Sequence, residues 1–120
     1  MTGEPRHDAP RVVALRELLE IRVPIRQAVD RLSEFGWDSA EELAVLEVRH
    51  VLNALDQFVA DRIRGEELVL WAETLSGRDD LEFRDRGEEL KQALFELSTP
   101  ELFGDLAGIA EEWRARLASA

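Results

Sequence analysis

Cysteine is absent from this chain of 120 residues, and lysine occurs only once. The missing cysteines exclude disulfide bonds, thiolate zinc sites and cysteine nucleophiles, and they are typical of proteins in a reducing compartment. No apolar run approaches the roughly 20 residues that a membrane-spanning helix needs. The first ten residues also lack the basic and apolar regions of a secretory signal. We therefore expect a cytoplasmic protein that does not enter a membrane.

Positive charge is scarce, because 26 acidic residues face 15 basic ones and give a net charge of -11. Residues 1–64 hold 12 acids and 9 bases, whereas residues 65–120 hold 14 acids and 6 bases, so the second half carries -8 of the -11. This charge repels nucleic acid and anionic membranes at long range and attracts basic proteins. Acidity also favours solubility, and a solvated surface is the simpler explanation of charge alone.

Apolar residues recur at intervals of three and four almost throughout the chain, and strict alternation is nearly missing. This periodicity predicts amphipathic helices rather than strands. A length of 120 residues is typical of one domain that buries a single core. We therefore expect an all-α, compact single-domain bundle of five to six helices over 11–120, preceded by a flexible leader over 1–10.

Proline and capping signals divide the first half into three predicted helices. The first two are predicted over 11–22 and 24–35, separated by a proline that lacks an N–H and suits the first turn of a helix. Ser39 and Glu42 have the spacing of a capping box, which predicts a third helix from this point to about residue 63. Because its front half is apolar on two sides, we expect this helix to be central.

Three shorter amphipathic helices are predicted in the second half. Their apolar stripes begin at Leu68, Leu90 and Leu106 and continue at i+3, i+4 and i+7. The tryptophans of the first and third stripes are predicted core residues. The stretch 81–83, LEF, is the only one that we expect to be extended.

Metal and catalytic motifs are weak in this sequence. The acidic stretch 78–89 lacks the central glycine and the alternating ligands of a calcium loop, and its arginines would compete for the carboxylates. Glu47 and His50 form one Glu-x-x-His pair, half of a di-iron motif, and a hydrogen-bonded structural histidine is the favoured interpretation. No nucleophile motif or phosphate-binding glycine loop occurs. We expect no metal, no cofactor and no enzymatic activity.

An acidic binding surface is the remaining candidate, because ten acids fall within the 31 residues from Glu66 to Glu96. Phe95 points away from the apolar stripe of its helix, which leaves an exposed anchor and a core contact equally open. For Leu70 a core contact is favoured, and Trp37 suits either a hydrophobic staple or an anchor. The predicted partner-binding residues are Glu66, Glu67, Glu73, Asp79, Asp80, Glu82, Asp85, Glu88, Glu89, Phe95 and Glu96.

Two segments of the chain resemble small, all-helical bacterial immunity proteins of the colicin-like and contact-dependent inhibition type. They read LDQFVADRIRGEELVLWAETLSGRDDLEF and LKQALFELSTPELFGDL, and together they cover about residues 55–106. The resemblance implies a helical inhibitor that neutralises a toxic nuclease through one protein interface without catalysis of its own.

The charge distribution and this resemblance lead to one hypothesis and two alternatives. The hypothesis is an immunity or antitoxin-like protein that binds a basic toxin domain through its acidic surface. The first alternative is a regulatory or scaffolding bundle that forms a homodimer through Phe95 and Trp37. The second is a metal-binding or enzymatic bundle around Glu47 and His50.

Overall fold

The computed structural model describes residues 9–35 and 42–119, and the predicted all-α bundle is confirmed for them. No described helix has the length and hydropathy that crossing a bilayer requires. The elements are α1 (Ala9–Glu20), α2 (Ile25–Leu32), a 3-10 turn (Ser33–Phe35), β1 (Ala44–Leu46), α3 (Val48–Val59), α4 (Gly65–Ser76), β2 (Leu81–Phe83), α5 (Gly87–Ser98), a second 3-10 turn (Pro100–Leu102) and α6 (Leu106–Ala118).

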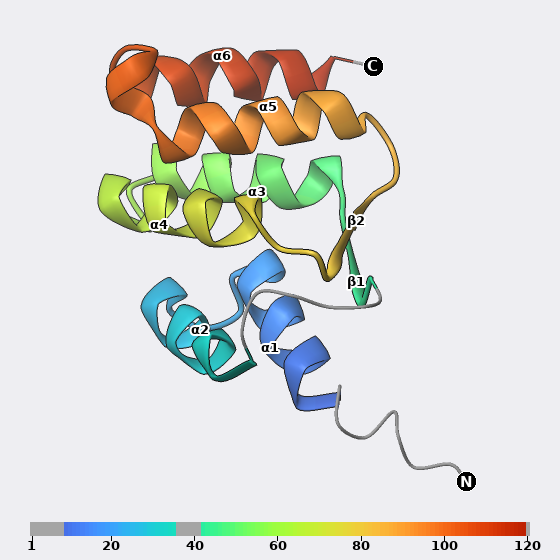
Figure 1. The fold of residues 1–120 in the computed structure, drawn as a ribbon. Helices are drawn as coiled ribbons and strands as arrows, with labels where there is room; N and C mark the ends of the chain where they lie inside the picture. The colour runs from blue at the N-terminus through green and yellow to red at the C-terminus, as the bar shows by residue number, and fades with distance from the viewer. Residues whose placement is uncertain (1–8, 36–41, 120) are drawn as a thin grey trace, which may run out of the picture.

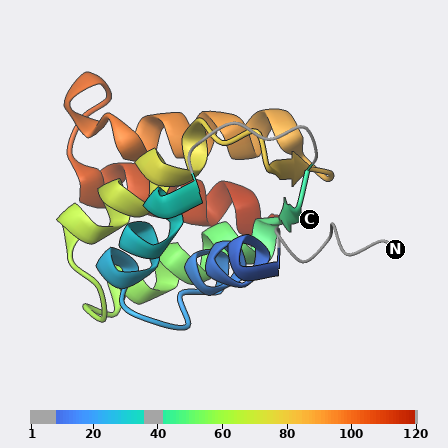
Figure 2. The same cartoon turned by 60° about the horizontal axis from the view of Figure 1, so that its bottom comes forward.

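The helices are stacked as three pairs (Figure 1). The pair α1 and α2 lies at one end, α3 and α4 form the middle, and α5 and α6 lie at the other end. The rotated view agrees, with α3 between α1 and α6 and α4 between α2 and α5 (Figure 2). The two strands lie beside the ends of the helices. The helix that we expected to be central is therefore half of the central pair.

The first two helices form close to their predicted positions. Pro24 precedes the first residue of α2, where its missing N–H removes no helical hydrogen bond. Ile21 turns the chain between the helices in the left-handed conformation, with φ 52°. α1 begins at Ala9, so the helix includes the last two residues of the predicted leader. Residues 1–8 lie outside the described residues.

The predicted third helix is wrong in its first part. Ser39 lies outside the described residues, and Ala44–Leu46, expected to be helical, forms β1 instead. β1 pairs in parallel with β2, and the Asp80 carbonyl accepts hydrogen bonds from the N–H groups of Leu43 (2.8 Å) and Ala44 (3.2 Å). These long-range bonds outweigh the local helical preference, so α3 begins only at Val48.

The second half matches the predicted pattern closely. The three apolar stripes are buried apart from Leu106, which is partly buried, and LEF is β2, as expected. Trp71 and Trp113 are fully buried core residues. The Trp71 indole N–H donates to the carbonyl of Leu18 at 2.8 Å, which ties α4 to α1. The Trp113 indole N–H donates to Glu96 at 2.9 Å, which ties α6 to α5.

Replacing Leu46 with alanine tests whether β1 is part of the core. Leu46 is fully buried, and its truncation should lower the free energy of unfolding by about 2–5 kcal/mol in urea denaturation. Val45→Ala is the control, because Val45 is only half-buried and should cost less. Equal losses for the two variants would contradict this position of the strand.

Candidate functional site

Asp80 is not part of the acidic surface, contrary to the prediction from sequence. Its side chain is 0% exposed and accepts hydrogen bonds from two guanidinium groups. Arg11 Nε of α1 lies 2.8 Å from Oδ2. Arg78 donates from Nε to Oδ1 at 2.9 Å and from Nη2 to Oδ2 at 3.0 Å. The Asp80 carboxylate is therefore a structural link between α1 and the turn after α4.

The pKa of Asp80 reflects two opposing influences. Burial alone would raise it, because a charged carboxylate loses its hydration in the core. The hydrogen bonds from Arg78 and Arg11 outweigh this effect and hold the pKa of Asp80 below its ordinary value. Asp80 is thus an anion whose charge is neutralised within the domain, and a partner has no access to it.

Four further acids of the predicted surface also have partners within the chain. Arg84 Nε donates to Glu82 at 2.9 Å, and Arg86 Nε donates to Glu89 at 2.6 Å. These hydrogen bonds lower the pKa of both carboxyl groups. Glu67 accepts from the backbone N–H of Arg64 at the start of α4, and Glu96 accepts from Trp113 and Gln92.

Arg86 explains why Glu89 has a structural role. Its guanidinium also donates to the carbonyls of Arg116, Leu117 and Ser119 at 3.0–3.1 Å, where α6 ends. The last carbonyls of a helix lack N–H partners in the next turn, so the arginine satisfies those of Leu117 and Ser119. The Arg116 carbonyl also accepts the Ser119 N–H at 3.3 Å. Glu89 holds the arginine in place and is only partly available to a partner.

The rest of the predicted acidic surface is exposed. Glu66 has one loose contact, 3.6 Å from Arg64, and both side chains are largely in solvent. Four carboxylates have no cation at ion-pair distance among the described residues. They lie on the outer part of α4, in the turn before β2, in the turn after it and in the first turn of α5, and they are Glu73, Asp79, Asp85 and Glu88.

The cations of the second half are all engaged. Four of the six in residues 65–120 are paired with carboxylates, namely Arg78, Arg84, Arg86 and Arg114. The other two lie over aromatic rings, Lys91 at 5.4 Å from the centroid of Phe83 and Arg116 at 4.0 Å from that of Trp113. A cation over a ring keeps its charge, so Lys91, which lines the same pocket as Asp79, offsets part of the negative charge of this half.

Phe95 is exposed, which decides the alternative that the sequence left open. Its side chain is 44% exposed and contacts the ring of Phe103 edge to face at 5.4 Å between centroids. Leu102 and Phe103 are also exposed, and sequence reasoning missed both. Leu70 is half-buried against the core, as favoured, and Trp37 lies outside the described residues.

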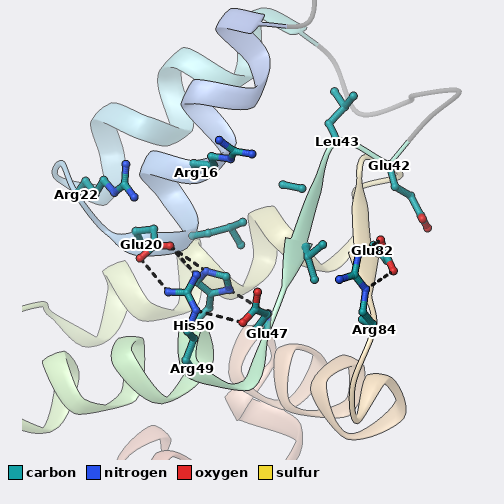
Figure 3. Close-up of a pocket in the computed structure, with 13 residues that line it drawn as sticks. Arg16, Glu20, Arg22, Glu42, Leu43, Glu47, Arg49, His50, Glu82 and Arg84 are labelled. Carbon is teal, nitrogen blue, oxygen red and sulfur yellow. Dashed lines mark hydrogen bonds and ion pairs between the residues drawn. The ribbon is translucent and has the colours of Figure 1, made fainter.

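A polar pocket of about 540 Å³ lies between α1, β1 and the start of α3 (Figure 3). His50, 3% exposed, lies at its base and uses both ring nitrogens. Nδ1 accepts the backbone N–H of Glu47 at 2.9 Å, so the neutral ring carries its proton on Nε2, which lies 3.2 Å from Glu20. Arg49 bridges the carboxylates of Glu20 and Glu47.

These contacts identify His50 as a hydrogen-bonded structural histidine, the interpretation favoured from sequence. A metal or a substrate would have to displace Glu20 or the backbone N–H of Glu47 to reach a ring nitrogen. Among residues 9–35 and 42–119, no three His, Asp or Glu side chains converge as a metal site requires. Nothing in the pocket thus favours a metal or catalytic centre around Glu47 and His50.

Comparison with known proteins identifies no relative of this chain. No protein-family model matches it, and no curated protein or solved structure is significantly similar to it.

Replacing Asp80 with asparagine should lower the free energy of unfolding by about 3–5 kcal/mol, because Arg11 and Arg78 would lose their buried counter-charge. Urea denaturation measures the loss. Asp79→Asn is the matched control one residue away, and it should change stability by less than about 0.5 kcal/mol. Similar values for the two variants would show that Asp80 is not a buried link.

His50 should make the domain less stable in mild acid. Burial lowers the pKa of His50, although the hydrogen bond to Glu20 opposes it, and Arg49 lowers it further. The unfolded chain therefore takes up the proton first, and the free energy of unfolding should fall as the pH drops from about 7 to about 5. In His50→Gln this decrease should be smaller. An unchanged pH dependence in the variant would exclude His50 as its source.

Proposed function

We propose that this protein binds and neutralises a cationic protein domain, in the manner of an immunity or antitoxin-like inhibitor. The observation that supports the proposal is the excess of unpaired negative charge in residues 65–120. Four of the six cations of that half are paired with carboxylates, while carboxylates on α4, α5 and the turns beside β2 remain exposed without a cation at ion-pair distance among the described residues.

This imbalance matters because free charge, unlike paired charge, acts at a distance. A paired carboxylate presents a small dipole to an approaching protein, whereas an unpaired one attracts a cation over a Debye length of about 8 Å at physiological salt. Such attraction raises association rates by one or more orders of magnitude. A nuclease must hold an anionic substrate in a basic cleft, so it is a suitable target for a surface of this kind.

The proposal differs from the sequence-based hypothesis in its residues. Asp80 is removed from the binding surface, and Glu67, Glu82 and Glu89 contribute less because they are held by Arg64, Arg84 and Arg86. The carboxylates expected to steer a partner are Glu73, Asp79, Asp85 and Glu88. Inhibition would follow from occupying the basic cleft, and it requires no catalytic group.

The direct test uses the cationic C-terminal domain of a toxin encoded beside the gene for this protein. That domain should bind the chain and lose its toxicity when the two are co-expressed. The association rate should fall about tenfold or more between low and physiological salt, because steering between free charges is screened. A gene neighbourhood without a cationic partner domain, or a domain that the chain neither binds nor inhibits, would overturn the proposal.

Two double charge reversals locate the surface. Asp79→Lys with Glu88→Lys changes the net charge by +4 at the proposed surface, and Asp30→Lys with Glu34→Lys makes the same change on α2 and the turn after it. Only the first pair should slow association with the toxin domain by about tenfold. All four side chains are exposed, so both variants should keep their helical circular dichroism. Equal slowing would mean that only net charge matters.

A further inference from the structure

Three exposed apolar side chains lie at or near the turn from α5 to α6, and we call them the apolar tip. They are Phe95 (44% exposed), Leu102 (66%) and Phe103 (42%). Single exposed apolar residues are normal on a protein surface, but a contiguous group of large ones is typical of a binding site. The edge-to-face contact of Phe95 and Phe103 shows that at least two of the three form one surface.

Local hydrogen bonds hold the backbone beneath the tip in place. The Phe95 carbonyl accepts from Ser98 Oγ at 2.9 Å, Thr99 Oγ1 at 2.7 Å and the Thr99 N–H at 3.1 Å. The Pro100 carbonyl then accepts from the N–H groups of Phe103 and Gly104 at 3.0 and 2.9 Å. Gly104 has a φ of +128°, which side chains disfavour. The rings are therefore presented on an ordered turn, which reduces the entropy that binding would cost.

The charge of the segment that forms the tip is of one sign. Residues 92–113 contain no lysine or arginine, so the tip has no cation in its own segment. Acidic residues interrupt and follow it in the sequence, and they are Glu96, Glu101, Asp105, Glu111 and Glu112. An apolar tip in an acidic segment is complementary to a surface with an apolar hollow and basic residues beside it.

We propose that the apolar tip is the anchor that docks into a cationic protein surface with an apolar hollow. This inference rests on the proposed function and adds the contact that supplies affinity, whereas the free carboxylates supply steering. A few desolvated aromatic contacts dominate the affinity of most protein interfaces. The tip lies at the opposite end of α5 from Glu88, so one partner that follows this helix would contact both.

Three synthetic helical peptides, two cationic and one acidic, are used as model ligands in a direct test of the tip. The first carries leucine on one face and arginine on the other, the second has the same net charge but no leucine, and the third pairs leucine with glutamate. In two-dimensional NMR at physiological salt, the leucine-arginine peptide should shift the amide signals of 95–105. The arginine peptide should bind mainly at low salt, and the leucine-glutamate peptide should not bind.

Substitution of the rings gives the quantitative test with the leucine-arginine peptide. Phe95→Ala with Phe103→Ala should weaken its binding by about tenfold or more. Val13→Ala is the matched control, because Val13 is 52% exposed on α1, in the helix pair at the far end of the stack. Leu102→Ala, the most exposed of the three positions, provides a second variant if the double variant unfolds.

The other outcomes separate this inference from the proposed function. If the peptide binds elsewhere and the Phe95/Phe103 variant behaves like Val13→Ala, the anchor is wrong and the proposed function stands. If neither arginine-containing peptide binds even at low salt, both are overturned. If sedimentation shows a self-association that the Phe95/Phe103 variant abolishes, the tip is a homodimer contact and the proposed occupant is wrong.

Discussion

The contacts of Asp80 join the first helix pair to the middle of this structure. Its carboxylate binds Arg11 of α1 and Arg78 of the turn after α4, and its carbonyl accepts the N–H groups of Leu43 and Ala44 that lead into β1. One residue therefore connects the first helix, the first strand and the α4–β2 turn. Because a buried carboxylate persists only when its charge is compensated, the two arginines are as necessary as the aspartate.

This arrangement also divides the acidic residues by role. Asp80 and Glu89 hold arginines that join separate parts of the fold, and Glu82 is paired with Arg84 at the surface. Carboxylates without a cation at ion-pair distance among the described residues are available to another molecule. The division explains why the number of acids in the segment from α4 to α5 overstates its binding surface. The segment around the α5–α6 turn differs, because residues 92–113 include acids but no lysine or arginine.

Local patterns in the sequence predicted the helices of the second half, because each stripe of apolar residues at helical spacing is buried against a neighbouring helix. They could not predict β1, whose pairing with β2 depends on residues nearly 40 positions away. They also placed Asp80 on the surface beside Asp79, since nothing in the order of residues indicates that Arg11 reaches it. The exposure of Phe95 was equally open, because it depends on which helices pack together.

The titration of individual carboxyl groups tests this division of roles most directly. NMR measurement of side-chain carboxyl signals against pH follows each aspartate and glutamate separately. We expect the pKa of Asp80, Glu82 and Glu89 to lie below the ordinary values of their residue types, because guanidinium groups hold each anion. An ordinary or raised pKa for Asp80 would contradict the account, since it would mean that Arg11 and Arg78 do not hold a buried anion.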